Sequence, residues 1–314
     1  HIRDDARWSN GALLTAYDFQ YAWMRLLTPD FAADYSSFFF SIKGARSYWD
    51  WRTKELVHKT ILTPEDIALK FRELVGVTVV DTKTIRVELE QPVPYFLDQL
   101  ALAVCSPVYK PCVEGWNIND SRMNTVISNG WQTVEPPPMK NRDWLSVDNA
   151  TGRLKQRHVW ARPNRLVSNG PFVLDRWRYK RDMRLVRNPF FHTPSQTTLH
   201  SIEAITIEDT NTAIMSFEAG GAHWLNGVNA DYQADMLDQK EQGLRTNIHK
   251  FPTFGTDFFS FNCRKKLNNG SRNPFHDSAV RRAFVFATNR DAIVKHATRL
   301  LEPTVSSFVP PDSI

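Results

Sequence analysis

The residues that could carry chemistry in this sequence are its histidines and carboxylates, and none of them stands in a catalytic spacing. The nine histidines are scattered, and His192 and His200 would ligate a metal only if the fold brought them together. Glu65 and Asp66 are adjacent, so on a helix their carboxylates point about 100° apart and form a poor general acid and base. The sequence contains no G-x-S-x-G, P-loop, G-x-G-x-x-G or H-E-x-x-H motif. We therefore expect no catalytic residue, no metal site and no cofactor. The open alternative is a hydrolase whose carboxylates meet only in the fold.

The three cysteines leave two interpretations open. Cys105, Cys112 and Cys263 form no C-x-x-C pair and no zinc-finger spacing. Cys105 and Cys112 are close enough in sequence for a disulfide if the chain turns at Pro107 and Pro111. The alternative is that they are buried free thiols.

Aromatic residues are the more informative feature. The chain has 10 Trp, 20 Phe and 8 Tyr, and many of them fall between the expected helices and strands. Aromatic side chains outside a regular apolar stripe often line ligand clefts, because they offer a large contact area and lose little rotamer entropy. The alternative is that they fill the gaps between lobes. The pattern favours a binding protein over an enzyme.

Length and charge exclude several classes of protein. A chain of 314 residues suggests about two domains. The net charge is +5, but the basic residues are dispersed, and the densest run, 176–187, alternates with aromatic and apolar residues as on the exposed face of a hairpin. No apolar run approaches the roughly 20 residues that cross a bilayer. We expect neither a nucleic-acid partner nor a membrane span.

The first third of the chain has clear start and stop signals. Thr15 and Asp18 have capping-box spacing, and apolar residues at helical intervals over 19–27 predict a helix that Pro29 ends. Thr63 and Pro64 predict the start of a second helix, which continues to about residue 75. Residues 77–90 predict a hairpin and residues after Pro94 a helix. The stretches 38–51 and 112–165 lack periodicity, so we expect the first to be irregular and the second to be a long surface excursion.

The rest of the chain alternates between the two kinds of element. Residues 172–186 predict a hairpin, followed by a strand at 202–207. Further predicted strands are 222–225 and 258–262, and further predicted helices are 211–219, 230–239, 277–287 and 291–299. Such alternation predicts an α/β fold with a mixed sheet.

Four segments, taken in order, resemble one family. The segments are A-R-W-S-N-G at 6–11 with L-T-A-Y-D-F-Q-Y-A-W at 14–23, P-V-P-Y-F at 92–96 after the hairpin, S-N-G-P-F-V-L at 168–174 with V-R-N-P-F-F at 186–191, and N-P-F-H-D at 273–277 with N-R-D-A-I-V at 289–294. Together they are similar to bacterial extracellular solute-binding protein family 5, which includes the periplasmic oligopeptide- and dipeptide-binding proteins of ABC importers. The sequence departs from the family in lacking both acids of A-G-E-I-D-W at 219–224, in a long 117–165 stretch, and in Gly255 at the position of a disulfide cysteine.

The resemblance implies an α/β fold of the periplasmic-binding-protein-like type II, with mixed sheets, flanking helices and incomplete lobes. It also implies three parts: residues 1–109 as a small α/β domain lacking its N-terminal part, 110–254 as part of the first domain with an inserted loop at about 117–165, and 255–314 as the start of a truncated third domain. The family's first strands precede W-S-D-G and its third domain continues beyond the P-P of 310–311, so we expect a central fragment.

The resemblance further implies an extracytoplasmic substrate-binding component of an ABC importer, which binds a peptide between two lobes and delivers it to the permease subunits. We expect a monomer with no enzymatic activity, either periplasmic or extracellular and membrane-anchored, although the chain contains no signal peptide. Relatives in the same family bind nickel chelates, haem, opines or oligosaccharides, and these ligands stay open as alternatives.

The same resemblance points to ligand-binding positions. Tyr35 matches a ligand-contacting tyrosine after the first helix, and Trp224 and Asn226 follow Gly220-Gly221. Thr253, Phe254 and Phe258 stand at the entry to the third part. The alternative for each of them is packing between lobes.

Overall fold

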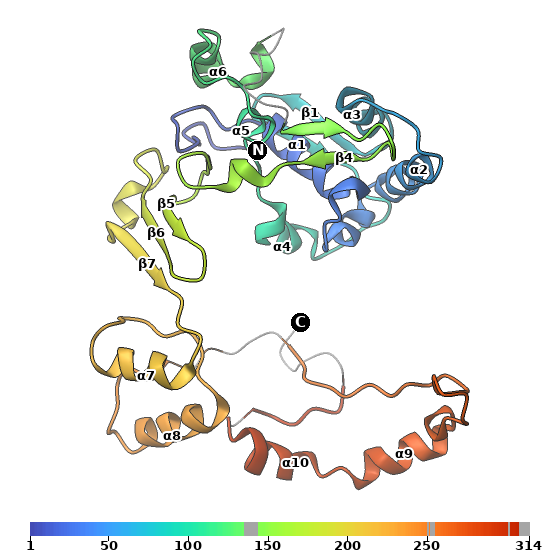
Figure 1. Ribbon diagram of the computed structural model, residues 1–314, viewed down its shortest axis with the longest axis vertical. Helices are drawn as coiled ribbons and strands as arrows, with labels where there is room; N and C mark the ends of the chain where they lie inside the picture. The colour runs from blue at the N-terminus through green and yellow to red at the C-terminus, as the bar shows by residue number, and fades with distance from the viewer. Residues whose placement is uncertain (135–143, 250, 252–254, 301, 308–314) are drawn as a thin grey trace. The chain divides into compact units, whose positions relative to one another are not determined.

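The computed structural model describes residues 1–134, 144–249, 251, 255–300 and 302–307, and the chain divides into two compact units (Figure 1). The first unit is His1–Thr206 and the second is Ile207–Ile314. Each unit has its own helices, and the sheets lie in the first.

Helix α1 (Ala16–Leu27) begins where its capping signal predicts. The backbone amide and the hydroxyl of Thr15 both donate to the carboxylate of Asp18, at 2.8 and 3.0 Å. One face of α1 is buried, and it carries Trp23 and Leu27. The predicted helix is confirmed.

The second helix and the hairpin are also confirmed. Helix α3 (Pro64–Leu74) has the same kind of cap, since the Thr63 hydroxyl accepts from the Asp66 amide at 3.1 Å and donates to its carboxylate at 2.7 Å. Strands β1 (Val77–Asp81) and β2 (Thr84–Val87) pair antiparallel, with Val77 opposite Val87. A short helix, α4 (Phe96–Leu100), follows Pro94 as expected.

The stretch 38–51 is more regular than its sequence predicts. A 3₁₀ helix, η2 (Ser36–Ser41), is followed by α2 (Ala45–Val57). The buried positions of α2 are Ala45, Tyr48 and Arg52, which do have helical spacing. The apolar pattern is hidden because one of these inward positions is an arginine.

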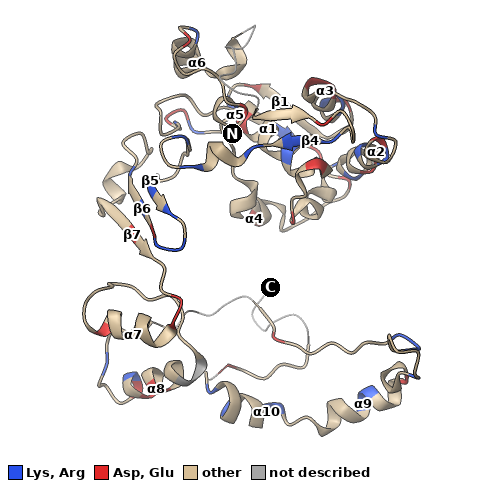
Figure 2. Cartoon of the chain, in the orientation of Figure 1, with Lys and Arg blue, Asp and Glu red and all other residues tan. Residues whose placement is uncertain are grey.

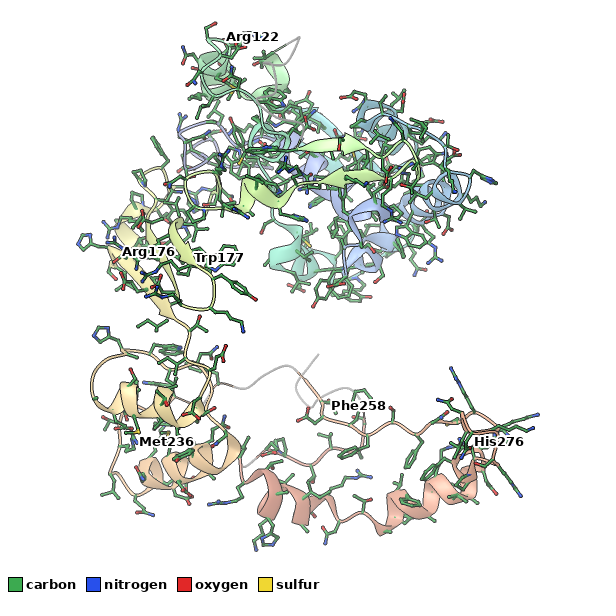
Figure 3. The ribbon with its side chains drawn as sticks, in the orientation of Figure 1. Arg122, Arg176, Trp177, Met236, Phe258 and His276 are labelled. Carbon is green, nitrogen blue, oxygen red and sulfur yellow. The ribbon has the colours of Figure 1, made fainter. Side chains whose placement is uncertain are left out.

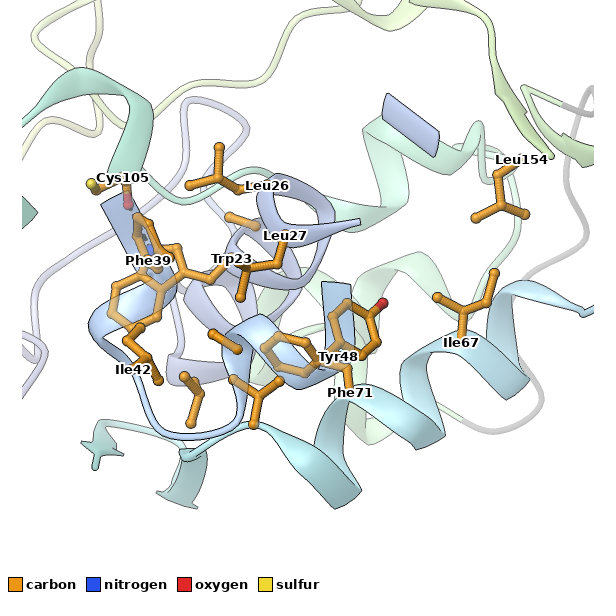
Figure 4. Packing of buried hydrophobic residues seen from close by; sticks show 14 of the residues in the cluster. Trp23, Leu26, Leu27, Phe39, Ile42, Tyr48, Ile67, Phe71, Cys105 and Leu154 are labelled. Carbon is orange, nitrogen blue, oxygen red and sulfur yellow. Dashed lines mark hydrogen bonds between the residues drawn. The ribbon is translucent and has the colours of Figure 1, made fainter. Parts of the chain in front are cut away.

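Two clusters of buried residues form the core of the first unit. The larger lies between α1, α2, α3 and β1, and Figure 4 shows Trp23, Phe39, Tyr48 and Phe71 packed within it. Its Trp23 also donates to the carbonyl of Cys105 at 2.9 Å. The smaller cluster contains Ile2, Trp8, Ala12, Leu14, Ala16, Tyr109, Trp116, Met123, Val126 and Val134. The smaller cluster therefore packs residues 2–16 against residues 109–134.

The stretch 112–165 contributes residues to this core, so its prediction as a long surface excursion is wrong. After α5 (Lys110–Glu114) the chain forms α6 (Met123–Asn129), and then an antiparallel hairpin of β3 (Leu145–Val147) and β4 (Leu154–Gln156). Val126 is fully buried, and Leu145 and Leu154 belong to the larger cluster. The elements are too short to show a period in the sequence, which is why the segment resembled a loop.

A buried ion pair holds the hairpin of this segment. Arg52 and Asp30 are both fully buried at their side chains, and the guanidinium donates to the two carboxylate oxygens at 2.7 and 2.8 Å. Arg52 also donates to the carbonyl of Gly152 at 2.7 Å, and the amide of Leu154 donates to Asp30 at 2.7 Å. The pair thus bridges α2 and the hairpin.

The last sheet of the first unit has three antiparallel strands. They are β5 (Phe172–Arg178), β6 (Asp182–Arg187) and β7 (Ser201–Ile205), in the order β5-β6-β7, as the sequence predicts. Asn188 is fully buried after β6, where it donates to the Gly170 carbonyl at 2.8 Å and accepts from the Phe190 amide at 3.0 Å. The bond to Gly170 joins the R-N-P motif after β6 to the N-G-P motif before β5.

The second unit contains the predicted helices. They are α7 (Thr210–Glu218), α8 (Ala230–Glu241), α9 (Ser278–Ala287) and α10 (Arg290–Ile293), the last continuing as a π-helical turn over Val294–Thr298. The strands predicted at 222–225 and 258–262 are wrong, because neither segment is a strand. A strand needs a hydrogen-bonded neighbour, and the described part of this unit offers these segments none.

All three cysteines are free thiols, so the Cys105–Cys112 disulfide is not formed. The Cys112 thiol donates to the carbonyl of Arg165, and burial raises the pKa of this thiol to about 11. Cys105 is buried within the larger core cluster. Of the two interpretations, that of free thiols is confirmed.

Candidate functional site

Tyr35 lies at the start of η2, in the first unit. Tyr35 is 53% exposed, and the centre of its ring lies 5.2 Å from that of Phe38, which is itself 39% exposed. The side-chain amide of Gln99, from α4, donates to the Phe38 carbonyl at 2.8 Å and holds this turn against α4. The two rings form an exposed aromatic pair on a fixed turn, an arrangement suited to stacking on a ligand.

Three further predicted positions lie in the second unit. Trp224 and Asn226 are exposed in the stretch between α7 and α8, and the exposed fraction of Trp224 is 65%. Phe258 is exposed on a stretch without regular structure (Figure 3). Thr253 and Phe254 lie outside the described residues. The predicted set is therefore divided between the units, with Tyr35 alone in the first.

Asp18, in the cap of α1, is a buried acid with a shifted pKa. Burial raises the pKa of Asp18 to about 6, against the opposing effect of hydrogen bonds from Thr15 and from the indole of Trp131, whose Nε1 lies 2.9 Å away. The carboxylate is fully buried and its partners are cap and core groups. Asp18 thus stabilises the fold and is closed to a substrate. Within the described ranges, no three His, Cys, Asp or Glu side chains are placed to hold a metal ion.

Positive charge is spread over the units and is partly paired (Figure 2). In the run 176–187, which forms the β5–β6 hairpin as predicted, Arg176 donates to Asp182 at 3.1 Å, and Arg178 pairs with the same carboxylate. These two arginines lower the pKa of Asp182 to about 2. A shared carboxylate between arginines is typical of a solvated sheet face. No helix in the described part of the chain has the length and apolar character needed to span a bilayer.

The fold has clear counterparts among solved structures. The Escherichia coli murein tripeptide binding protein MppA matches with a TM-score of 0.68 and 21% identity, over 99% of this chain and 48% of that one. Haemophilus influenzae OppA in complex with RPPGFSPFR matches with a TM-score of 0.61 and 20% identity, over 99% and 48%. The chain therefore has a periplasmic-binding-protein-like fold, and the predicted fold class is confirmed.

The sequence comparisons define the family. The model of bacterial extracellular solute-binding proteins, family 5 middle, matches residues 1–314, so the chain belongs to this family and the predicted resemblance is confirmed. The oligopeptide-binding protein OppA of Bacillus subtilis is 26% identical over 311 residues, which cover 99% of this chain and 45% of that protein. The probable deoxycholate-binding periplasmic protein YgiS of Escherichia coli is 24% identical over 314 residues, covering 99% and 46%. The chain spans under half the length of these relatives.

Proposed function

We propose that this chain belongs to the extracytoplasmic substrate-binding component of an ABC importer, and that its ligand is a peptide. The observation that carries the proposal is the family match over the whole chain, together with a relative named as an oligopeptide-binding protein. A structural neighbour, Haemophilus influenzae OppA in complex with the nine-residue sequence RPPGFSPFR, adds support. The partners in this proposal are the peptide and the permease subunits.

The exposed aromatic residues are the proposed ligand contacts. Tyr35 and Phe38 offer a paired ring surface in the first unit, and Trp224, Asn226 and Phe258 offer exposed groups in the second. Thr253 and Phe254 complete the proposed set. A peptide held by its backbone, as an added strand, with its side chains in hydrated pockets, would be bound with little regard to sequence. Closure of two lobes over the ligand would give the form that the permease recognises.

We assign 1–109, 110–254 and 255–314 to three successive parts of the family's domains. The protein acts as a monomer without a cofactor or nucleic-acid partner, makes and breaks no bond, and resides in the periplasm or on the outer side of the membrane, with or without an anchor. The support is the family's extracellular description.

A second candidate is uptake of a non-peptide solute by the same fold. It is favoured by one observation, that the relative YgiS is named as a probable deoxycholate-binding protein. Nickel chelates, haem, opines and oligosaccharides belong to the same candidate class.

Ligand binding by the chain extended to its natural length tests the proposal. Tryptophan fluorescence, followed while a peptide mixture and then each alternative solute is added, should change saturably with peptides. Tyr35→Ala should weaken peptide binding about tenfold, because one exposed aromatic contact is lost. Tyr179→Ala, at the exposed tip of the β5–β6 hairpin, is the matched control and should leave binding unchanged. Saturable binding of only a non-peptide solute would favour the second candidate, and peptide cleavage products in mass spectra would refute a pure binding role.

A further inference from the structure

A pocket of about 580 Å³ lies inside the first unit, between α1 and α3. Helix α1 contributes Tyr17, Tyr21 and Arg25, which are four residues apart and so share one face. Helix α3 contributes Ala68 and Arg72, again four apart. The facing stripes of two separate helices therefore form opposite walls of one space. Of the proposed peptide contacts that the structure describes, none lines it.

The 117–165 segment closes this space. Trp131 and Gln132, from the 3₁₀ turn η4 (Trp131–Thr133), line it beside α1, and Leu145 and Leu154 of the β3–β4 hairpin line its apolar side. The buried ion pair of Arg52 fixes the hairpin in this position. The pocket is thus built by residues that lie far apart in the sequence and that the fold holds in place.

The charges around the pocket favour an anion. The amino group of Lys110 lies 4.6 Å from the centre of the Trp131 ring and 5.6 Å from that of Tyr21, so these aromatic faces already hold a cation. Arg25 and Arg72 add two more cations. The Glu114 carboxylate accepts from the Tyr21 hydroxyl and from the Trp116 indole, each at 3.3 Å. Glu65 also lines the space, so its charged side chains are three cations and two carboxylates, an excess of one positive charge.

Two buried polar atoms in the lining have no hydrogen-bond partner among the described residues. They are Nε of Arg25, a donor, and Oε1 of Gln132, an acceptor. A buried polar atom without a partner costs about 1 to 3 kcal/mol, and a bound ligand is one way to remove that cost. Ile67 and Phe71 supply an apolar floor to the same space.

We propose that this pocket is a second ligand site, which binds a small amphipathic anion: a flat apolar body with one carboxylate or sulfonate group. The apolar body lies against Ile67, Phe71 and Leu154. The anionic group faces Lys110, Arg25 and Arg72. This site is independent of the peptide-binding role and would exist in the chain even if that role were wrong.

A pair of fluorescent probes tests the site in the 314-residue chain. The anion 8-anilinonaphthalene-1-sulfonate should bind with a saturable, single-site transition, and the uncharged N-phenyl-1-naphthylamine, which has the same rings, should bind about tenfold more weakly. Ala68→Trp fills the pocket and should abolish the transition. Leu69→Trp, on the exposed face of the same helix, is the matched control and should keep it. Background binding to exposed apolar residues should be the same in both variants.

The charge requirement has its own variant. Lys110→Gln should weaken binding of the sulfonate about tenfold and leave the neutral probe unchanged, whereas Lys70→Gln, whose amino group lies over Trp51 instead, should change neither. Circular dichroism should show native helix content in every variant, and Ala68→Leu replaces Ala68→Trp if the larger residue unfolds the unit. Equal binding by the two Ala68 and Leu69 variants, or equal affinity for the two probes, would overturn the proposal.

Discussion

The two units of the chain differ in how they bury their helices. In the first, α1, α2 and α3 enclose residues such as Leu27, Ile67 and Phe71, which are fully or almost fully buried. In the second, α9 is amphipathic, yet its Phe284 and Phe286 are 53% and 81% exposed. Helices in both units have side-chain N-caps: Thr63 caps α3 and Asp277 caps α9.

This difference separates two determinants of structure. Local signals, meaning a cap and apolar residues at helical spacing, are sufficient to define a helix in either unit. Burial of its apolar face requires surfaces from elsewhere in the fold, and the described part of the second unit provides few of them. The match covers only 45% of OppA of Bacillus subtilis, so that relative contains further surfaces. We therefore expect substitutions of equal size to have unequal effects in the two units.

The largest contrast is expected between two phenylalanines. Phe71→Ala should lower the free energy of unfolding of the first unit by about 4 kcal/mol, because it leaves a cavity in the core. Phe286→Ala should change the stability of the second unit by less than about 0.5 kcal/mol. Urea unfolding followed by circular dichroism measures both. Similar losses for the two variants would contradict the contrast.

The next effect concerns ion pairs within the first unit. Asp30→Ala should cost about 3 kcal/mol of unfolding free energy, because it leaves the Arg52 charge buried without its carboxylate. The matched control is Asp50→Ala, which breaks an exposed pair with Arg46 on the same helix and should cost less than about 0.5 kcal/mol. Chemical denaturation compares the two variants. A loss of unfolding free energy for Asp30→Ala as small as that for Asp50→Ala would show that the buried pair contributes little to stability.

A third effect compares two helix-capping aspartates through pH. Burial raises the pKa of Asp18 to about 6, so the folded state binds this proton more tightly than the unfolded state, whose pKa is about 3.9. This contribution to stability is complete below about pH 4 and is lost as pH rises to about 6, by about 2.5 kcal/mol. In α7, hydrogen bonds from Thr212 lower the pKa of Asp209, so its contribution is instead lost as pH falls.

The pH dependence of the contribution of Asp18 is measured by unfolding wild type and Asp18→Asn at a series of pH values from 4 to 7. The difference between the two proteins should change across that window, because only the wild type titrates at this position. A constant difference would show that the pKa of Asp18 is normal. Asp209→Asn should show its own change only at lower pH.

The smallest of these effects concerns a glycine. Gly152 has φ +68°, and a Cβ there would lie 2.4 Å from the Thr60 carbonyl oxygen, so Gly152→Ala should cost about 2 kcal/mol in the first unit. Gly243 in the second unit has φ +74° with no atom within 4 Å of the same position, and Gly243→Ala should cost about 1 kcal/mol from backbone strain alone. Thermal unfolding of both variants checks this. Equal losses would show that contact with Thr60 is relieved by movement.

The sequence predicts those structural features that depend on interactions between residues close together in the chain. The caps at Thr15 and Thr63 lie three residues from their partners, and α1 and α3 begin where those signals predict. Helix α2 was missed because its inward Arg52 finds its partner Asp30 twenty-two residues earlier in the chain. The strands expected at 222–225 and 258–262 are absent because strand formation depends on a neighbour.

Candidate binding sites are also hard to predict where their residues lie far apart in the sequence. The family resemblance points to Tyr35 and Trp224, both of which are exposed, and their role as ligand contacts stays a prediction. The α1–α3 pocket was missed entirely. Its walls come from α1, α3, Lys110 and the 117–165 segment, and no spacing along the sequence reveals that these surfaces face one another. A four-residue repeat of Tyr17, Tyr21 and Arg25 was the one available signal.

The buried pair of Arg52 and Asp30 also limits how this protein can change over evolutionary time. Both side chains take bonds from the β3–β4 hairpin, through the Gly152 carbonyl and the Leu154 amide. A lineage that deleted the hairpin would strip those bonds from two charges that stay in the interior, so a shortened descendant would first have to replace Arg52 and Asp30 together. The hairpin and the buried pair are therefore coupled, and loss of the one requires replacement of the other.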